Sequence, residues 1–282
     1  MVFVAPGFSG DMGSPDILDT VGVLEPLLVD RFEVTRSDWR HWFGAAPDHG
    51  ALTIDEVRTT PERADWPAFC TYFEAQEVAE RRGMRLPTAR EWLYLGVGRR
   101  SRFPWGRSIV KSIANTSELG LRRPVPVGCF EGGKSWAGVY DLIGNVAEWV
   151  EGPLPGEARA RADEGYALGP WNPGEFGNQV WAMGGSYATR VAELYVRDWD
   201  ETNAREFPPG TRTPELGVRC VAEAEAWLGG RLDELAAAPD ALTRLEQLGA
   251  RFGAEALPVL ERLLLERPEH PALVALLNGA RP

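Results

Sequence analysis

The feature that most constrains the fold of this chain is the high density of glycine, proline and tryptophan in its first 220 or so residues. The 282 residues include 31 Gly, 22 Pro and 11 Trp. Short apolar runs bounded by turn residues alternate here with long Gly- and Pro-rich segments, which predicts short strands joined by ordered loops. The expected strands are Val2–Val4, Phe32–Val34, Val125–Val127 and Gly217–Val221, and the expected loops are Gly152–Gly177 and Asp200–Pro214.

Two helices are expected within this region. The spacing of apolar residues from Thr71 to Arg82 matches one helical face, and Gly83 follows as a glycine just past a helix should. A second helix is expected after Pro87, where Thr88 and Glu91 have the spacing of a capping box.

The composition changes near Val221 to Ala, Leu, Glu and Arg, which predicts a helical segment. The expected helices are Glu225–Ala237, Asp240–Phe252, Ala254–Glu266 and Pro271–Asn278. We therefore expect two parts, residues 1–222 and a helical extension of residues 223–282 that resembles the hairpins of helical-repeat arrays. About 60 residues are marginal as an independent domain, so this segment is expected to dock on the main body or on a partner.

The charge of the chain bears on its partners and location. A formal net charge of −11 repels phosphate backbones, so no nucleic acid partner is expected. No apolar stretch approaches the roughly 20 residues of a membrane helix, so no membrane partner is expected. The first ten residues lack the pattern of a signal peptide, and the expected location is the cytoplasm.

Several motifs occur in a fixed order along residues 1–222. They are Asp11-Met-Gly-Ser14, Phe32-Glu-Val-Thr35, Arg85-Leu-Pro-Thr-Ala-Arg-Glu-Trp92, Phe103-Pro-Trp-Gly106, Ala114-Asn115, Pro126-Val-Gly128, Gly138-Val-Tyr-Asp-Leu-Ile-Gly-Asn-Val-Ala-Glu-Trp149, Gly184-Gly-Ser186 and Gly217-Val-Arg219. Together they resemble the formylglycine-generating-enzyme family, the sulfatase-modifying factors. The resemblance implies an α+β, C-type-lectin-like fold with little regular secondary structure, followed here by a small all-α extension.

The resemblance also implies which chemistry to look for. Family members that oxidise a sulfatase cysteine use two cysteines after the Gly-Gly-Ser motif, and these thiolates bind copper(I). The two positions correspond to Thr189 and Leu194, and the family's groove tryptophan corresponds to Ala147. Neither a hydroxyl nor an isobutyl group replaces a thiolate on copper(I), so no copper and no formylglycine generation are expected.

Other ligand sets for a metal-dependent enzyme are not apparent in the sequence. Relatives of the ergothioneine sulfoxide synthase type bind iron through histidines of an added N-terminal helical domain. The chain has three histidines, His41, His49 and His270, without the spacing of a ligand pair. Its three cysteines form no CxxC motif and are too few for a zinc site made of cysteines alone.

A binding surface is the remaining expectation for the altered site. The expected groove residues are Ser186, Tyr187, Thr189, Arg190, Leu194, Tyr195, Arg197 and Trp199. Tyr, Trp and Arg are the residue types that dominate binding hot spots. We favour a non-catalytic module that recognises a protein or peptide partner. The alternative is a divergent oxidoreductase of the same family with an unrecognised site.

The resemblance implies one calcium site and one pair of cysteines. The calcium ligands carried over are the side chains of Asp141 and Glu148 and the carbonyls of Gly144 and Val146, which are the hard oxygen donors that calcium selects. A second family site begins at Asn115 but lacks its aspartate, so at most one structural calcium is expected. Cys70 and Cys220 match cysteines that pair in secreted relatives and are expected to be neighbours.

Overall fold

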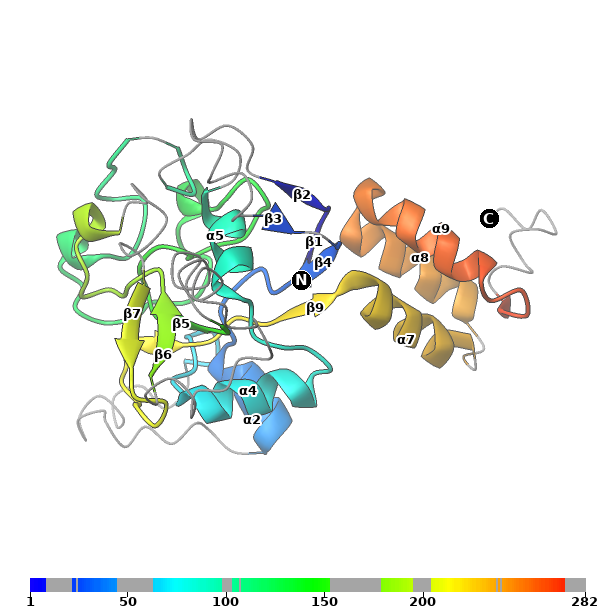
Figure 1. Cartoon of the computed structure of the whole chain (residues 1–282), viewed down its shortest axis with the longest axis horizontal. Helices are drawn as coiled ribbons and strands as arrows, with labels where there is room; N and C mark the ends of the chain where they lie inside the picture. Colours follow the sequence, from blue (N-terminus) through cyan, green and yellow to red (C-terminus); the bar gives the residue numbers. More distant parts are fainter. Residues whose placement is uncertain are drawn as a thin grey trace, which may run out of the picture.

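The architecture is an α+β body with a bundle of helices at one end (Figure 1). The computed structural model describes residues 1–8, 22–23, 25–44, 63–97, 103–106, 108–152, 179–194, 204–236, 238 and 240–271. The strands are β1 (Val2–Val4), β2 (Gly7–Phe8), β3 (Gly22–Val23), β4 (Leu27–Val29), β5 (Ala147–Val150), β6 (Val180–Met183), β7 (Ala204–Phe207), β8 (Leu216–Gly217) and β9 (Val221–Glu223). The helices are α2 (Arg36–Phe43), α4 (Tyr72–Arg81), α5 (Ala89–Val97), α7 (Ala224–Ala236), α8 (Ala241–Phe252) and α9 (Leu257–Leu265). Single 3-10 turns are η1 (Ser117–Leu119), η2 (Glu131–Gly133), η4 (Val191–Glu193) and η5 (Ala254–Ala256).

The strands of the described residues form three small sheets. The largest has the order β7-β6-β5-β8, in which β8 runs parallel to β5 and the other pairs are antiparallel. A second, antiparallel sheet has the order β1-β4-β9, and β2 pairs with β3. The short strands and the long connections between them agree with the predicted α+β fold of low regular secondary structure.

The sheet β1-β4-β9 joins the body to the helical extension. Successive side chains of a strand point to opposite faces, and here both faces are covered. Val2, Val4, Leu27 and Val29 face a core cluster of the body, whereas Phe3 and Leu28 pack among the leucines of α7, α8 and α9. This explains why every residue of β1 and β4 is buried.

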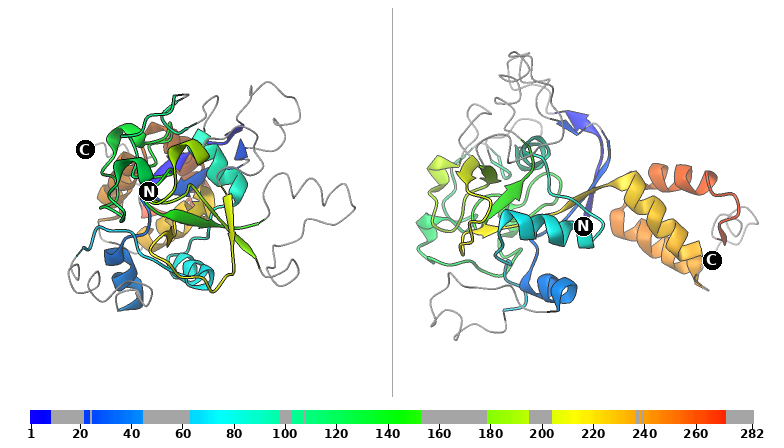
Figure 2. Two further views of the ribbon diagram at one scale, coloured as in Figure 1. Left: turned by 90° about the vertical axis from the view of Figure 1, so that its left-hand side faces the viewer. Right: turned by 60° about the horizontal axis from the view of Figure 1, so that its bottom comes forward.

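The helical extension therefore packs on the body, as expected. The right-hand view of Figure 2 shows β9 running from the body directly into α7, with α8 and α9 beside it. The three helices begin and end within two residues of the predicted bounds, except that the third predicted helix is a 3-10 turn, η5, followed by α9. Most of the fourth predicted helix lies outside the described residues. The division at residue 222 stays a prediction.

Local sequence signals explain the helices of the body. The Thr71 hydroxyl accepts from the Glu74 N–H, and the Glu74 carboxylate accepts from the Thr71 N–H, so α4 starts with a capping box. The predicted box of Thr88 with the carboxylate of Glu91 is confirmed at the start of α5 by the same pair of bonds. Helix α2 was not predicted, although Thr35 caps it in the same way with Asp38.

Three of the four predicted strands are wrong in whole or in part. Only the two ends of Gly217–Val221 belong to strands, Gly217 to β8 and Val221 to β9. Phe32–Val34 and Val125–Val127 are not strands, and the strand of the first region is β4, Leu27–Val29, instead. The backbone at Val34 is nevertheless paired, because its N–H donates to Val218 O (2.8 Å) and its carbonyl accepts from Ala68 N–H (2.8 Å). These single bonds to two different segments satisfy the backbone without forming a ladder.

The packing of α9 makes a first prediction. Leu264 is 4% exposed in the core shared with β1 and β4, and its neighbour Leu265 is 68% exposed. Truncating the buried residue leaves a cavity, so Leu264→Ala is expected to lower the free energy of unfolding by about 2–5 kcal/mol. The matched control Leu265→Ala is expected to change it by about 0.5 kcal/mol or less. Urea unfolding of the full chain measures both, and equal effects would contradict the packing described.

Candidate functional site

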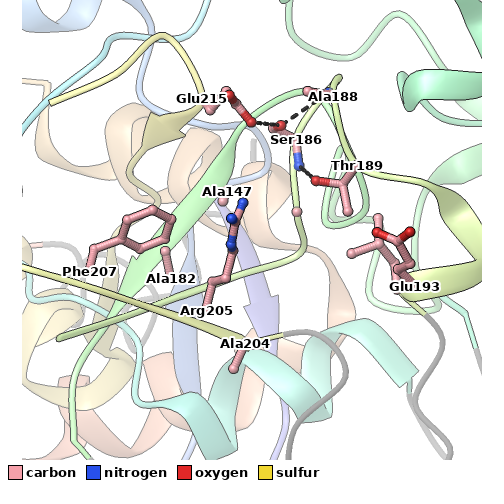
Figure 3. A pocket seen from close by; sticks show the side chains of 12 residues that line it. Ala147, Ala182, Ser186, Ala188, Thr189, Glu193, Ala204, Arg205, Phe207 and Glu215 are labelled. Carbon is pink, nitrogen blue, oxygen red and sulfur yellow. Dashed lines mark hydrogen bonds between the residues drawn. The ribbon is translucent and has the colours of Figure 1, made fainter. Parts of the chain in front are cut away.

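A pocket of about 490 Å³ lies over one face of the sheet β7-β6-β5-β8 (Figure 3). Trp149 of β5 is opposite Ala182 of β6, which is opposite Arg205 of β7, so these three side chains share a face. Ala147 is two residues from Trp149 on β5, and Phe207 is two residues from Arg205 on β7. Both side chains therefore lie on the same face. Ala147 and Ala182 are both small and adjacent, and they leave the space that becomes the floor of the pocket.

The rim of the pocket is the loop that follows β6. Gly184 and Gly185 both have positive φ, which turns the chain back over the sheet. A Cβ on Gly185 would lie 2.5 Å from Leu194 Cδ2 and 3.1 Å from Thr189 Cβ, so only glycine lets the rim close against these two residues.

Hydrogen bonds fix the polar residues of the rim. The Thr189 hydroxyl accepts from the Ser186 N–H (3.0 Å), and the Ser186 hydroxyl donates to Glu215 Oε2 (2.5 Å) and accepts from the Ala188 N–H (3.1 Å). Thr189 at the position of a family cysteine thus has a structural role in the turn.

The lining has an apolar floor and charged groups of both signs. Ala147, Ala182, Leu194 and Phe207 supply the apolar part. Figure 3 shows the Arg205 side chain rising from β7 between Phe207 on one side and Thr189 on the other. Arg205 lies 5.7 Å from the centroid of the Phe207 ring, and Glu193 and Glu215 also line the pocket.

The predicted groove residues divide into three groups. Ser186, Thr189 and Leu194 line the pocket. Tyr187 and Arg190 belong to the same loop but are not among the lining residues, and the exposed Arg190 lies 3.9 Å from Glu193. Tyr195, Arg197 and Trp199 lie outside the described residues. Sequence reasoning missed Ala182, Arg205, Phe207 and Glu215, because only strand pairing brings them here.

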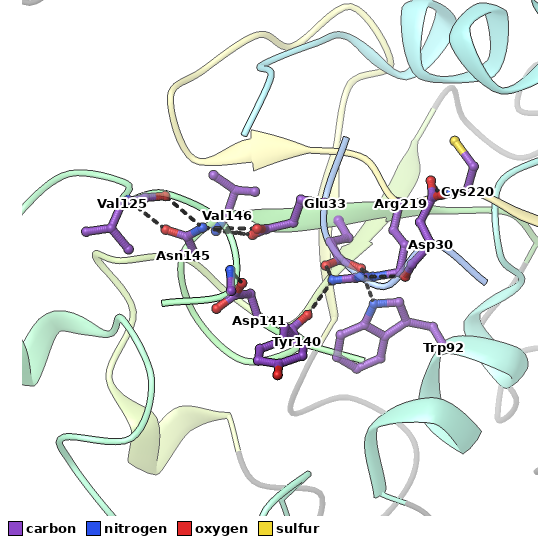
Figure 4. Close-up of polar contacts among 12 residues, drawn as sticks. Asp30, Glu33, Trp92, Val125, Tyr140, Asp141, Asn145, Val146, Arg219 and Cys220 are labelled. Atoms are coloured by element: carbon purple, nitrogen blue, oxygen red, sulfur yellow. Dashed lines mark hydrogen bonds and ion pairs between the residues drawn. The ribbon is translucent and has the colours of Figure 1, made fainter. Parts of the chain in front are cut away.

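Beneath the pocket, β5 carries a buried ion pair (Figure 4). Arg219 donates through Nε and Nη2 to both oxygens of Glu148 (3.0 and 2.6 Å), and the side chains are 0% and 1% exposed. Trp92 Nε1 also donates to Glu148 Oε2 (2.8 Å). The remaining Arg219 bonds go to the carbonyls of Asp30 (2.8 Å) and Tyr140 (2.7 Å).

Two further buried carboxyl groups lie beside this ion pair. Glu33 accepts from Asn145 Nδ2 (3.0 Å), and burial, together with Asp141 and Glu148, raises the pKa of Glu33 well above its ordinary value. Burial also raises the pKa of Asp141 to about 6, although Asp141 accepts from the Gly128 N–H (2.6 Å). Three carboxyl groups therefore lie around the single guanidinium of Arg219.

The four predicted calcium donors lie close together in the sequence, three of them in the turn before β5 and Glu148 on β5 itself. Gly144 and Asp141 both have positive φ, and the pKa of Asp141 is raised chiefly by burial and to a smaller extent by repulsion from Glu148. Glu148 Oε1 accepts one hydrogen bond and Oε2 accepts two, so a lone pair remains on Oε1. No described residue donates a backbone hydrogen bond to the carbonyl of Gly144 or Val146. These carboxylate and carbonyl oxygens are hard donors of the kind that calcium selects.

The cysteines are free thiols. Cys70 and Cys220 are both fully buried in the same core cluster. Burial, followed by Glu74 and then Cys220, raises the pKa of the Cys70 thiol, and a Cα separation within the range of a disulfide stays a prediction. Cys129 is exposed and lies apart from the pocket lining.

Comparison with known proteins identifies the family. The model of the sulfatase-modifying factor enzyme 1-like domain (FGE-sulfatase) matches residues 1–224, and the chain belongs to this family. A hercynine oxygenase of Mycolicibacterium thermoresistibile is 34% identical over 153 residues, which are 50% of this chain and 34% of that protein. The chain thus spans about a third of the length of this relative. An inactive C-alpha-formylglycine-generating enzyme 2 of Bos taurus is 27% identical over 206 residues, 51% of this chain and 68% of that protein.

Solved structures show the same fold. PvdO from Pseudomonas aeruginosa superposes with a TM-score of 0.56 at 20% identity and covers 79% of this chain and 93% of that chain. CarF superposes with a TM-score of 0.54 at 20% identity and covers 79% and 97%. The predicted family fold is confirmed. Within the described residues, no helix has the length and apolar character needed to cross a membrane.

The buried ion pair makes a second prediction. Arg219→Met leaves the Glu148 carboxylate buried without its partner, and the free energy of unfolding is expected to fall by about 3–5 kcal/mol. Adding Glu148→Gln removes that charge and is expected to restore part of the loss. The control is Arg231→Met, which breaks an ion pair with Glu234 whose side chains are 47% and 64% exposed; it should cost about 1 kcal/mol or less. Denaturant unfolding of the wild type and these three variants measures the losses, and equal costs for Arg219→Met and Arg231→Met would contradict the role assigned here.

Proposed function

We propose that this chain is a non-catalytic binding module of the FGE-sulfatase family that recognises a protein or peptide partner through the pocket over β5, β6 and β7. The observation that carries the proposal is that Ala147, Thr189 and Leu194 line one pocket. These are the positions at which the family resemblance expects the groove tryptophan and both copper-binding cysteines. The pocket therefore keeps its place on the fold while its donors for copper(I) are replaced by small, hydroxyl and apolar side chains.

The lining supports binding more than catalysis. Its volume lies in the range of pockets that hold a small ligand or a few side chains. The apolar floor offers a site for an aliphatic or aromatic side chain, and Arg205 and Glu193 offer charges of opposite sign for a peptide's polar groups. Among the described residues, no group of three or more His, Cys, Asp or Glu side chains is arranged to hold a metal ion.

The second candidate is a divergent oxidoreductase, and the relatives named hercynine oxygenase favour it. Their match covers about half of this chain and about a third of theirs. Of the described histidines, His41 is exposed on α2, and His270 contacts Leu232 O (2.8 Å) in the helical extension. Neither lines the pocket. Calorimetric titration with iron(II) separates the candidates, because an iron-dependent oxidoreductase requires a stoichiometric site and a binding module requires none.

Two expectations from the sequence accompany the proposal. The negative net charge argues against nucleic acid as the partner. The cytoplasmic location expected from the first residues stays a prediction.

We further propose that the loop from Asp141 to Glu148 holds one structural calcium ion. The side chains of Asp141 and Glu148 and the carbonyls of Gly144 and Val146 would supply its protein ligands. The support is the set of oxygen donors in this loop and the three carboxyl groups that surround one guanidinium. The ion would stabilise the turn that leads into β5 and thus the floor of the pocket.

The calcium proposal predicts a calcium-dependent stability. At calcium 100 times above its dissociation constant, the EDTA-treated protein is expected to gain about 2.7 kcal/mol of stability, seen as a rise in melting temperature. Asp141→Asn should abolish the rise, and Glu234→Gln, an exposed acid on α7, should retain it. An unchanged melting temperature in the wild type, or an undiminished rise in Asp141→Asn, would count against this site.

The binding proposal predicts that filling the pocket abolishes peptide binding. Peptides selected from a display library on the wild-type chain are expected to bind Ala147→Trp at least about tenfold more weakly, because the indole occupies the floor between β5 and β6. The control is Ala254→Trp, an exposed position in η5 far from the pocket. Fluorescence anisotropy measures the affinities. Equal affinity for wild type and Ala147→Trp would place the binding surface elsewhere, and a library that yields no binder would refute the proposal.

A further inference from the structure

At the start of α2 lie two arginines, Arg36 and Arg63, that have no carboxylate partner among the described residues. Arg36 is the first residue of the helix and is 6% exposed. Its Nε and the Nη1 of Arg63 are buried and have no hydrogen-bond partner. No described residue forms an ion pair with either guanidinium. Burying a charge without a partner is unfavourable, so this arrangement calls for an explanation.

Aromatic rings account for part of the environment of these cations. The Arg63 guanidinium carbon lies 3.8 Å from the centroid of the Trp66 ring. The Arg36 guanidinium carbon lies 5.6 Å from the same ring and 5.1 Å from the Phe69 ring. Stacking of this kind stabilises the charge through the flat face of the guanidinium. The N–H groups point outward in the plane of the guanidinium, and stacking leaves them available to an acceptor.

Backbone hydrogen bonds fix the two arginines relative to one another. The Arg36 N–H donates to Trp66 O (2.8 Å), and the Ser37 N–H donates to Ala64 O (2.9 Å). The segment that carries Arg63 is thus tied along the first turn of α2. The backbone segments that carry the two guanidinium groups are therefore held together by hydrogen bonds.

Charges around the pair are mostly of the same sign. Burial, followed by Arg63, lowers the pKa of Arg36, and burial, followed by Arg123, lowers the pKa of Arg63, against the opposing effect of Asp65. Asp38 is engaged in the capping box, where it accepts from the Thr35 N–H (3.0 Å). This local excess of positive charge occurs in a chain whose formal net charge is −11.

We propose that Arg36 and Arg63 form a binding site for a small oxyanion, a phosphate or a carboxylate. Guanidinium groups bind both kinds of anion through pairs of parallel N–H donors, and the first turn of a helix adds a favourable field. Neither Arg36 nor Arg63 lines the pocket over the sheet, so this site is separate from the proposed peptide pocket.

Isothermal titration calorimetry of the full chain with inorganic phosphate and with succinate, at constant ionic strength in chloride, tests the site. One of the two anions is expected to bind with 1:1 stoichiometry, and which one binds identifies the ligand class. Arg36→Gln is expected to weaken binding roughly tenfold or more, since it removes charged hydrogen bonds. Arg40→Gln is the matched control, because Arg40 is exposed on the same helix.

Two more variants keep the test decisive. Arg63→Gln changes a partly exposed residue, and it serves in place of Arg36→Gln if that variant fails to fold. Asp65→Asn removes the opposing carboxylate and is expected to tighten binding. Binding of neither anion above the chloride background would overturn the proposal. An equal loss of affinity in Arg36→Gln and Arg40→Gln would overturn it as well.

Discussion

The bidentate ion pair between Glu148 and Arg219 is the interaction on which the rest of the body depends. It joins β5 to the segment between β8 and β9, and the same two side chains contact α5 through Trp92 and the loops at Asp30 and Tyr140. A body with so few regular elements has few ladders to hold its parts together. A buried pair with this many hydrogen bonds therefore favours one arrangement, because another would leave a buried charge without its partner.

The pocket follows from this framework. Glu148 points into the ion pair, and the neighbouring Ala147 points to the opposite face of β5, where the pocket lies. The residues that hold β5 in place are thus distinct from those that line the pocket. Thr189 and Leu194 take no part in the ion pair, so changes at these two positions leave that pair intact. Fold and chemistry are separable in this way, because a pocket can keep its place on a fold while the side chains that line it change.

Sequence reasoning succeeded where the signal is local. Capping boxes fix the starts of α4 and α5, and the leucine spacing of residues 240–265 gives α8 and α9. It failed where a residue contacts segments that are far away in the sequence. Phe32–Val34 has the composition of a strand, but its bonds go singly to Ala68 and Val218. Arg205 and Ala182 enter the pocket only through the register of β6 and β7, which no local pattern encodes. Thr189 and Leu194 could be predicted as residues of one site because the Gly184-Gly-Ser186 motif precedes them in the sequence.

The most direct test of the central claim, that this pocket binds without catalysing oxidation, is mass spectrometry of a cysteine-containing sulfatase peptide. The peptide is incubated with the purified chain under air, with and without copper(I), beside a control without protein. Thr189 and Leu194 supply no thiolate to hold copper(I), so the cysteine is expected to remain unchanged beyond the control. Conversion of that cysteine to formylglycine above the control would contradict the account.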